Sequence, residues 1–493
     1  MNKSAELDVR VKFGLKSFIT VIAILLAVLI AVGVLTFVIP AGRYTIYTTD
    51  ASKADQPFYQ YTADESLNKQ IVIDSYRELA EDENTTRLPM VRWFTAPIEA
   101  LFLGSNSTNM LMIIALLLVL GGTFKVLEES GGLISLVRVI MVKLHSRRFA
   151  AIWIITAVIM VLSAVFGLQE QLLILYPIFA MLCTALNWSR FTAISLILIS
   201  SGVGFTTAIT NPLTIGTASI AAGVSVTDGI WYRCLIFCVM YVVTSLFLTC
   251  LAKRDEKRVT EKFDFKSFAL VTDQEHIEDI RKAKMIVALF SLALLSVIVA
   301  TAIDALRSLA MVFMAVAFIV GTVIVGKILL GSYRYLGKCF VKGVKDVLPS
   351  IAIIMIAFGI TYIAQQGNIL HTIFYYFYHS VTNISPYVAV VVLYVFVLII
   401  EFFIPSASAK AVLIIPMLTL APIEGISKTV IILTYLFADG YTNVLYPTCG
   451  TLLVGLGLAN VSFAQWFKKT ILFQLLLFAL SLGFLMLAVF IKL

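Results

Sequence analysis

Apolar stretches long enough to cross a lipid bilayer recur along the whole chain. A membrane-spanning helix needs about 20 consecutive apolar residues, and within lipid such a run folds as a helix because its backbone groups must bond to one another. The sequence therefore predicts an all-α polytopic membrane protein. Runs of this order lie at Ser17–Pro40, Asn109–Leu127, Ala150–Phe166, Ile230–Cys250, Met285–Ile303, Leu309–Leu330 and Phe467–Ile491.

Composition agrees with a chain that lives in a bilayer. Of the 493 residues, 60% are hydrophobic and 13% are charged, whereas about a quarter of the residues in a globular protein are charged. No polar segment is large enough to be a soluble enzyme domain, and the sequence has neither a G-x-x-x-x-G-K-[ST] phosphate loop nor a metal-ligand pattern. We therefore expect no enzymatic activity, no ATP-driven pump, no metal and no cofactor.

The net charge of +8 is distributed over short connecting segments, which is typical of the positive-inside rule. This distribution argues against a nucleic-acid partner. Arg10, Lys12 and Lys16 mark the cytoplasmic side of the first span. The acidic segment Thr48–Met90 is then expected outside, and the basic segment Ala252–Lys284 is expected to be a cytoplasmic linker between two halves of the chain.

Three polar stretches within apolar sequence occur twice, in the same order. "GTFKVLEESGGL" matches "GITYIAQQGNIL", "FGLQEQLLILYPIFAML" matches "FIPSASAKAVLIIPMLTL", and "GVGFTTAITNPLTIG" matches "ADGYTNVLYPTCGTL". Gly122 aligns with Gly359, Pro177 with Pro416 and Gly204 with Gly440, so the three offsets agree within three residues. Self-similarity of this kind predicts an internal repeat.

Charge predicts that the two copies are inverted relative to one another. In the first copy the helix ending near Leu127 is followed by basic residues, whereas in the second the matching helix, residues 349–365, is preceded by them. The same element therefore enters the membrane from opposite faces. The basic residues are Arg138, Lys143, Arg147 and Arg148 in the first copy, and Arg334, Lys338, Lys342 and Lys345 in the second. Inverted repeats with interrupted helices are typical of secondary transporters.

The second matched stretch is expected to be a re-entrant hairpin. In "EFFIPSASAKAVLIIPML", Pro405 and Pro416 interrupt an apolar run and each removes a backbone donor. Irregular backbone at membrane depth is tolerated only where it is buried in protein or lines a wet cavity. "FGLQEQLLILYP" is the corresponding hairpin tip of the first half.

The third matched stretch is expected to be a helix broken near its middle. Thr207–Ser219 and Asp439–Leu453 each combine a proline and glycines with polar side chains, Thr210 and Asn211 among them. Unwound backbone offers carbonyl oxygens to a cation and amide groups to an anion. Proline-kinked helices whose hydroxyls bond their own backbone are the alternative, and the presence of two hairpins and two breaks in inverted register argues against it.

The motifs resemble one known family. "FVIPAGRY", "FGLQEQLLILYP", "TNPLTIGTASIAAGV", "FFIPSASAKA" and "ADGYTNVLYPTCGTLLVGLGLA" are similar in order and spacing to motifs of the YfcC-like group of the C4-dicarboxylate anaerobic carrier family, in the ion transporter superfamily. The resemblance covers nearly the whole chain. It implies a homodimeric elevator transporter in which two hairpins and two broken helices carry the substrate.

The resemblance also implies a substrate site of polar residues at the two tips and the two breaks. By matched position these are Gln169 and Glu170, Asn211 and Thr214, Ser406 and Ser408, and Asn443, Pro447 and Thr448. Two residues depart from the family pattern: Gln171 stands where a second acid is expected, and Lys410 where a neutral polar residue is expected. Whether Na⁺, H⁺ or an exchanged solute drives transport is therefore left open.

Ionisable residues deep in apolar sequence are expensive and are functional candidates. Asp439 opens the second break, and Glu401 lies deep in the span before the second tip. We expect one of these acids to pair with Lys410, which then either replaces a bound Na⁺ or binds a substrate carboxylate. A lysine that snorkels from the hairpin to water is the alternative.

The expected function is secondary active transport of a small carboxylate-bearing metabolite, a dicarboxylate or an amino acid, across the cytoplasmic membrane. Exchange of basic amino acids, of the arginine/ornithine type, is the alternative, and a channel is disfavoured because the sequence has no repeated filter. The expected parts are listed by residue number: an N-terminal scaffold and outer segment 1–108, first repeat 109–252, linker 253–284, scaffold helices 285–346, and second repeat with C-terminal helix 347–493.

Overall fold

The structure is a computed structural model that describes residues 15–50, 58–62, 72, 75–80, 83–104, 107–144, 147–258, 273–303, 306, 309–381, 384–404, 407–420 and 425–493. This part of the chain is mostly helical, as its apolar runs predict. Six of its helices are long and apolar enough to cross a membrane. A helix pair bent by 43°, Tyr333–Pro349 with Ile354–Gln366, would make a seventh span. The protein is therefore a multi-pass membrane protein.

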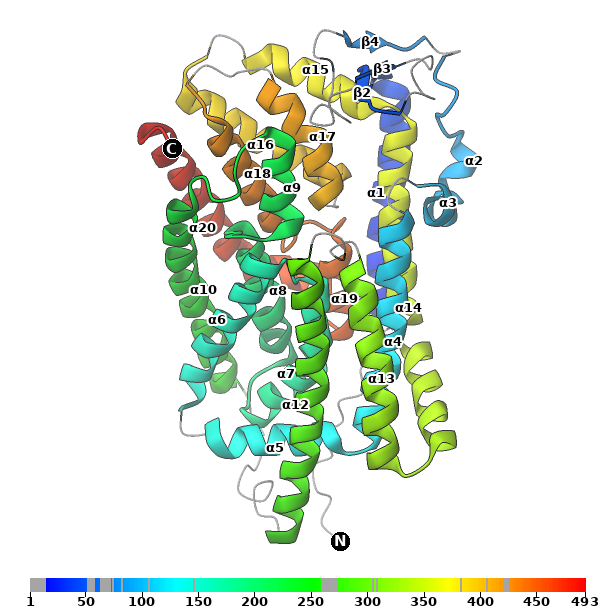
Figure 1. Ribbon diagram of the computed structural model, residues 1–493, viewed down its shortest axis with the longest axis vertical. Coiled ribbons are helices and arrows are strands. Elements are labelled where there is room, and N and C mark those ends of the chain that lie inside the picture. Colours follow the sequence, from blue (N-terminus) through cyan, green and yellow to red (C-terminus); the bar gives the residue numbers. More distant parts are fainter. Residues whose placement is uncertain are drawn as a thin grey trace.

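One group of helices is built around the long helix α14. Helix α14 contacts α1, α3, α4 and α13, while α12 packs against α13 and α5. Figure 1 shows α1, α4, α13 and α14 together at the right. The bounds are α1 (Leu15–Val38), α2 (Met90–Trp93), α3 (Ala96–Leu103), α4 (Ser107–Glu129), α5 (Gly132–Leu144), α12 (Asp273–Ala302), α13 (Ala310–Leu330) and α14 (Tyr333–Gln366).

A second group contains the segments that the sequence predicts as two hairpins and two breaks. Its centre is the contact between α8 and α18, which α6 and α16 flank. Two short non-α segments, η5 (Glu170–Leu175) and η6 (Pro212–Gly216), belong to the first hairpin tip and the first break. The helices are α6 (Arg148–Phe166), α7 (Tyr176–Ala185), α8 (Arg190–Thr206), α9 (Thr217–Ala222), α10 (Ile230–Arg258), α16 (Pro386–Phe403), α17 (Ala407–Leu420), α18 (Lys428–Thr442), α19 (Gly450–Leu458) and α20 (Phe463–Phe490).

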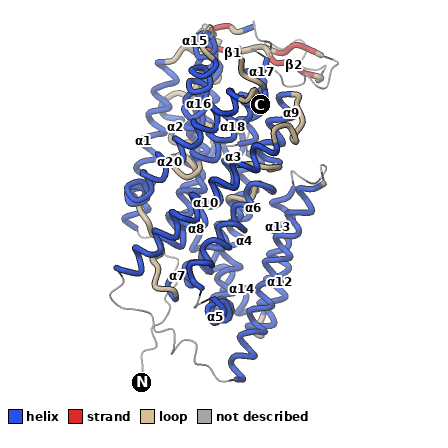
Figure 2. The backbone as a smooth tube through the Cα atoms, turned by 90° about the vertical axis from the view of Figure 1, so that its left-hand side faces the viewer, coloured by secondary structure: helices blue, strands red, loops and turns tan. Residues whose placement is uncertain are grey.

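The two halves of this second group make matching contacts. Helix α10 packs against α6 and α8, and α20 packs against α16 and α18. Helix α17 contacts α9 across the halves, and α19 contacts η5. Helices α8 and α18 both begin at a serine cap, Ser189 and Ser427, followed by a basic residue. Figures 1 and 2 both place α7 toward the lower end of the molecule and α17 toward the upper end.

Glycine allows α8 and α18 to approach each other at backbone distance. A Cβ on Gly440 would lie 2.1 Å from the backbone nitrogen of Thr206, and a Cβ on Gly202 would lie 2.3 Å from Val444 Cγ1. No side chain fits at such distances, so glycine at these two positions sets the separation of the helices that lead into the two breaks.

The acidic outer segment contains two short strand pairs, which the all-α expectation did not include. Strand β1 (Gly42–Arg43) pairs antiparallel with β4 (Arg77–Glu78), and β2 (Ile46–Thr48) pairs parallel with β3 (Tyr59–Tyr61). The strands lie beside helix α15 (Ile369–Val381) at the upper end of Figure 1.

The linker expected at Ala252–Lys284 is partly helical. Helix α10 continues to Arg258 and α12 already begins at Asp273, while residues 259–272 lie outside the described part of the chain. The charged start of α12 lies at the end of the molecule opposite the strands (Figure 1). The two polar segments thus lie at opposite ends of the molecule, and their location on opposite sides of a membrane stays a prediction of the positive-inside rule.

Candidate functional site

The first break wraps around the end of helix α6. The backbone N–H groups of Ile209, Thr210 and Asn211 all donate to the carbonyl oxygen of Ala164, at 2.8, 3.2 and 3.1 Å. Asn211 Oδ1 then accepts from the backbone N–H of Leu213 at 2.9 Å and starts the η6 segment. The break is therefore held by hydrogen bonds that an uninterrupted helix would not make.

Side chains from the flanking spans satisfy carbonyl oxygens at both breaks. At the first break the Arg233 guanidinium of α10 donates to the backbone carbonyl of Ile209 at 3.2 Å. It also donates to the backbone carbonyls of Asp228, at 2.9 Å, and Val226. At the second break Trp466 Nε1 and Gln474 Nε2 of α20 donate to the carbonyl of Val444, at 2.8 and 3.2 Å. Sequence reasoning missed these supporting roles.

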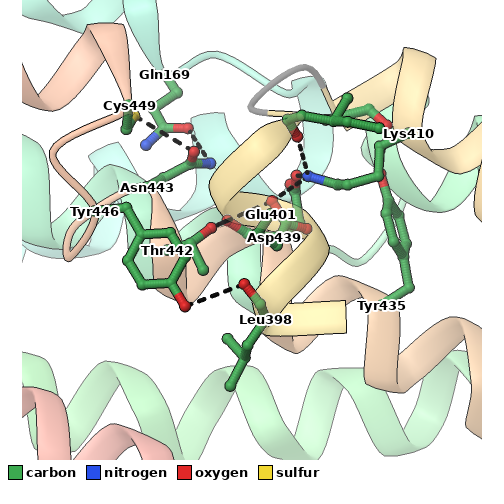
Figure 3. A network of polar contacts seen from close by, with 12 residues as sticks. Gln169, Leu398, Glu401, Lys410, Tyr435, Asp439, Thr442, Asn443, Tyr446 and Cys449 are labelled. Carbon is green, nitrogen blue, oxygen red and sulfur yellow. Dashed lines mark hydrogen bonds and ion pairs between the residues drawn. The ribbon is translucent and has the colours of Figure 1, made fainter. Parts of the chain in front are cut away.

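The first hairpin tip touches both breaks. Gly167 adopts φ 73°, and a Cβ there would lie 2.4 Å from Asn211 Oδ1. Two residues later, Gln169 Oε1 accepts a hydrogen bond from Asn443 Nδ2 at 2.9 Å, and Asn443 Oδ1 accepts from Cys449 Sγ at 3.5 Å (Figure 3). The structure thus brings Gln169, Asn211 and Asn443 into one neighbourhood.

Buried donors without an acceptor mark this neighbourhood. Within the described part of the chain, Asn211 Nδ2, Thr214 Oγ1 and Thr448 Oγ1 are buried and have no hydrogen-bond partner. The three residues are exposed by 0, 0 and 1%. A buried polar group without a partner costs on the order of 1–3 kcal/mol, so a site with several of them favours a solute rich in acceptors, such as a carboxylate.

Beside these amides lies a buried ionic group of three residues, Glu401, Lys410 and Asp439. Lys410 Nζ donates to Glu401 Oε2, to Asp439 Oδ1 at 2.8 Å and to the carbonyl of Ile404 at 3.4 Å (Figure 3). The lysine is 0% exposed, so it does not snorkel to water. The sequence anticipated one acid as its partner, and the structure pairs it with both.

The ionic group and the amides are joined through the end of α18. Thr442 precedes Asn443 in sequence, and its Oγ1 lies within hydrogen-bond distance of Glu401 Oε2 (3.3 Å) and of the carbonyl oxygen of Asp439 (3.1 Å). The Lys410 Nζ lies 5.7 Å from the centre of the Tyr435 ring, and the Tyr435 hydroxyl donates to the carbonyl of Ala407 at 2.6 Å. Charge and substrate candidates therefore share one continuous polar region.

The remaining predicted site residues are placed less centrally. Glu170 begins η5 and is half-buried, within electrostatic range of Asp439. Thr210 is exposed and its hydroxyl donates to the carbonyl of Val165 at 3.2 Å, while Pro447 is half-buried. Three side chains lie outside the described part of the chain, those of Gln171, Ser406 and Ser408.

A family model matches nearly the whole sequence. The model of the C4-dicarboxylate anaerobic carrier, DcuC, matches residues 18–490. The chain belongs to this family. Its members are membrane transporters, so the polar region between the breaks lies in a protein of a transporter family.

Two curated relatives extend over nearly the same length. "Putative basic amino acid antiporter YfcC" of Escherichia coli (strain K12) is 24% identical, over 93% of this chain and 94% of its own. An uncharacterized protein of Haemophilus influenzae (strain ATCC 51907 / DSM 11121 / KW20 / Rd) is 23% identical, over 92% of this chain and 93% of its own.

Two solved transporters are similar in structure. The YdaH transporter of Alcanivorax borkumensis superposes with a TM-score of 0.43 at 14% identity, covering 97% of this chain and 98% of its own. MtrF of Neisseria gonorrhoeae gives a TM-score of 0.44 at 15% identity, covering 95% of each chain.

Proposed function

We propose that this DcuC-family protein is a secondary active transporter of a small carboxylate-bearing metabolite, either a dicarboxylate or an amino acid. The observation that carries the proposal is the set of buried, unpartnered donors at the two breaks: Asn211 Nδ2, Thr214 Oγ1 and Thr448 Oγ1. Amide and hydroxyl donors bind a carboxylate without a second buried charge.

The proposed transport mechanism is an elevator that moves the second helix group, with its hairpins and breaks, against the first. Support comes from the matching contacts of α10 and α20, and of α17 with α9 and α19 with η5, which two inverted repeats would produce. The two groups are expected to work in a homodimer in the cytoplasmic membrane. Native mass spectrometry of the protein in detergent tests the dimer.

Exchange of basic amino acids is the second candidate. Lys410 is fully engaged by two internal acids, so its ammonium is not free to bind a substrate carboxylate in this conformation. Glu170 is half-buried near the same region and could face a cationic side chain. The name of the Escherichia coli relative points to the same class of solute.

Counterflow in proteoliposomes tests the proposal and separates the two candidates. Vesicles loaded with unlabelled solute and free of ATP are diluted into labelled succinate, aspartate, arginine or ornithine. We expect uptake of one class only, and lowered uptake in Asn211→Ala. Absence of counterflow for every carboxylate and amino acid, from protein that is folded and inserted, would refute the proposed function.

A further inference from the structure

The ionic group Glu401–Lys410–Asp439 contains more negative than positive charge. The two carboxylates are 2 and 1% exposed and the ammonium is 0% exposed. Fully ionised, the three side chains carry a net charge of −1 at buried positions of α16, α17 and α18. An uncompensated buried charge is costly, so one additional positive charge would stabilise the group.

All three N–H donors of Lys410 are already used, so the ammonium cannot bind the remaining carboxylate oxygens. An ammonium has three N–H donors, and these go to Glu401 Oε2, Asp439 Oδ1 and the carbonyl of Ile404. The other oxygen of each acid, Glu401 Oε1 and Asp439 Oδ2, is buried with no hydrogen-bond partner in the described part of the chain. Two acceptor oxygens are thus open beside a saturated lysine.

A further acid lies close to this group. Glu170 of η5 is within electrostatic range of Asp439, so it offers no positive charge to the pair of acids. The other titratable neighbours are three tyrosines. Tyr394 of α16, Tyr435 of α18 and Tyr446, which follows α18, lie within electrostatic range of Glu401, and Tyr435 is also within range of Asp439. Tyr435 and Tyr446 donate to the carbonyls of Ala407 and Leu398, so neither hydroxyl satisfies the open carboxylate oxygens.

We propose that Glu401 and Asp439 together bind one proton beside Lys410, and that this proton is the coupling ion of the transport cycle. An O–H bond forms on Glu401 Oε1 or Asp439 Oδ2 with a proton from water on one side of the membrane, and it breaks when the proton is released to water on the other side. The proton belongs to the pair of acids rather than to either one. The coupling part of this inference rests on the proposed transport function.

The geometry favours a proton over Na⁺. Hard cations take several oxygen ligands, whereas the central position between these two acids is occupied by an ammonium, which would repel a second cation. A proton needs only one carboxylate oxygen and leaves the group electrically neutral. The ammonium of Lys410 therefore leaves no position between the two acids for a metal ion.

Infrared spectroscopy of the full-length protein tests the proton site without any transported solute. We expect the wild type at neutral pH to show a carboxylic-acid C=O band that disappears on raising the pH. The band should be absent from Glu401→Gln and from Asp439→Asn, because one acid paired with one lysine is already neutral. Glu128→Gln is the matched control, since Glu128 is a carboxylate paired with Lys125 at 2.8 Å outside this group.

Each outcome decides the matter. A wild type with no such band, or a band that survives both amide substitutions, overturns the inference. If NaCl removes the wild-type band, the bound ion is Na⁺ and the inference is also overturned. We expect NaCl to raise the thermal stability of Lys410→Gln and not that of the wild type. The wild-type pH titration remains informative if a variant fails to fold.

A pH gradient tests the coupling separately. If succinate or arginine shows counterflow, an acidic exterior should drive its accumulation several-fold in wild-type vesicles and not in Asp439→Asn. Counterflow without accumulation refutes the coupling. Absence of any counterflow refutes the proposed transport function but leaves the infrared test of the proton site intact.

Discussion

Asn443 Nδ2 donates to Gln169 Oε1 at 2.9 Å and joins the second break to the first hairpin tip, although the two residues are 274 positions apart in sequence. Gly167, on the same tip, packs against Asn211 of the first break. One short loop therefore lies against both interrupted helices. We therefore expect a substitution at either break to change the affinity for the same solute.

Replacing the amides at the breaks should weaken substrate binding. In Asn211→Ala and Asn443→Ala a donor is lost, and we expect the apparent KM for transport to rise by about 10-fold or more, since such a hydrogen bond is worth about 1–3 kcal/mol when its loss leaves a buried group unpaired. Ser296→Ala in α12, whose hydroxyl bonds only the carbonyl of Ala293 among the described contacts, is the control. Normal affinity in both alanine variants would contradict the site.

The crossing of α8 and α18 should not tolerate a side chain. Gly440→Ala would place a Cβ against the Thr206 backbone, and overpacking of this kind costs about 1–3 kcal/mol or more. We expect the Tm of the purified protein to fall by several degrees. Gly483→Ala in α20, where a Cβ would meet nothing within 4 Å, should leave Tm unchanged or slightly raised. Equal behaviour of the two variants would argue against a close crossing.

The packing of the outer segment on α15 should weaken in acid. His371 Nδ1 accepts a hydrogen bond from the backbone N–H of Tyr44 at 3.0 Å, and burial, assisted by the positive charge of Arg43, lowers the pKa of His371 from 6.5 to about 4. The unfolded chain takes up this proton at a higher pH than the folded protein does. The stabilisation is therefore complete above about pH 6.5 and is lost as the pH falls through about 4.

The variant His371→Asn separates this effect from other titrations. Its Oδ1 can still accept from Tyr44 but cannot be protonated in this range. Thermal unfolding followed between pH 4 and 7 should show a smaller loss of Tm in the variant than in the wild type. Parallel curves for the two proteins would show that His371 does not contribute.

Labelling should report that α8 and α18 begin on opposite sides of the membrane. Arg190 and Lys428 are the exposed first residues of these helices, each directly after a serine cap. With the exposed Cys234, Cys238 and Cys250 replaced by alanine, an impermeant maleimide applied to intact cells should label Lys428→Cys but not Arg190→Cys. Inside-out vesicles should give the reverse. Labelling of both from one side would refute the inverted repeat.

Much of the helical layout follows from local sequence. The predicted span Ala150–Phe166 corresponds to Arg148–Phe166, and Leu309–Leu330 to Ala310–Leu330. The interruptions at Thr207–Ser219 and Asp439–Leu453 are also where regular helix stops. The length of an apolar run, a proline or a polar cluster affects only the backbone within a few residues of it. The spans and their interruptions can therefore be inferred from sequence alone.

The contacts that define the candidate site depend on the tertiary structure. Sequence identified Lys410, Glu401 and Asp439 as costly buried charges but could not decide that both acids meet one ammonium. It also did not reveal that Arg233, Trp466 and Gln474 support the breaks from other helices. The sequence by itself determined the membrane class, the spans and the interruptions, because the bilayer and the backbone impose them locally. Only the folded chain decided which polar groups meet, because those pairings join residues from different helices whose distances depend on how the helices pack.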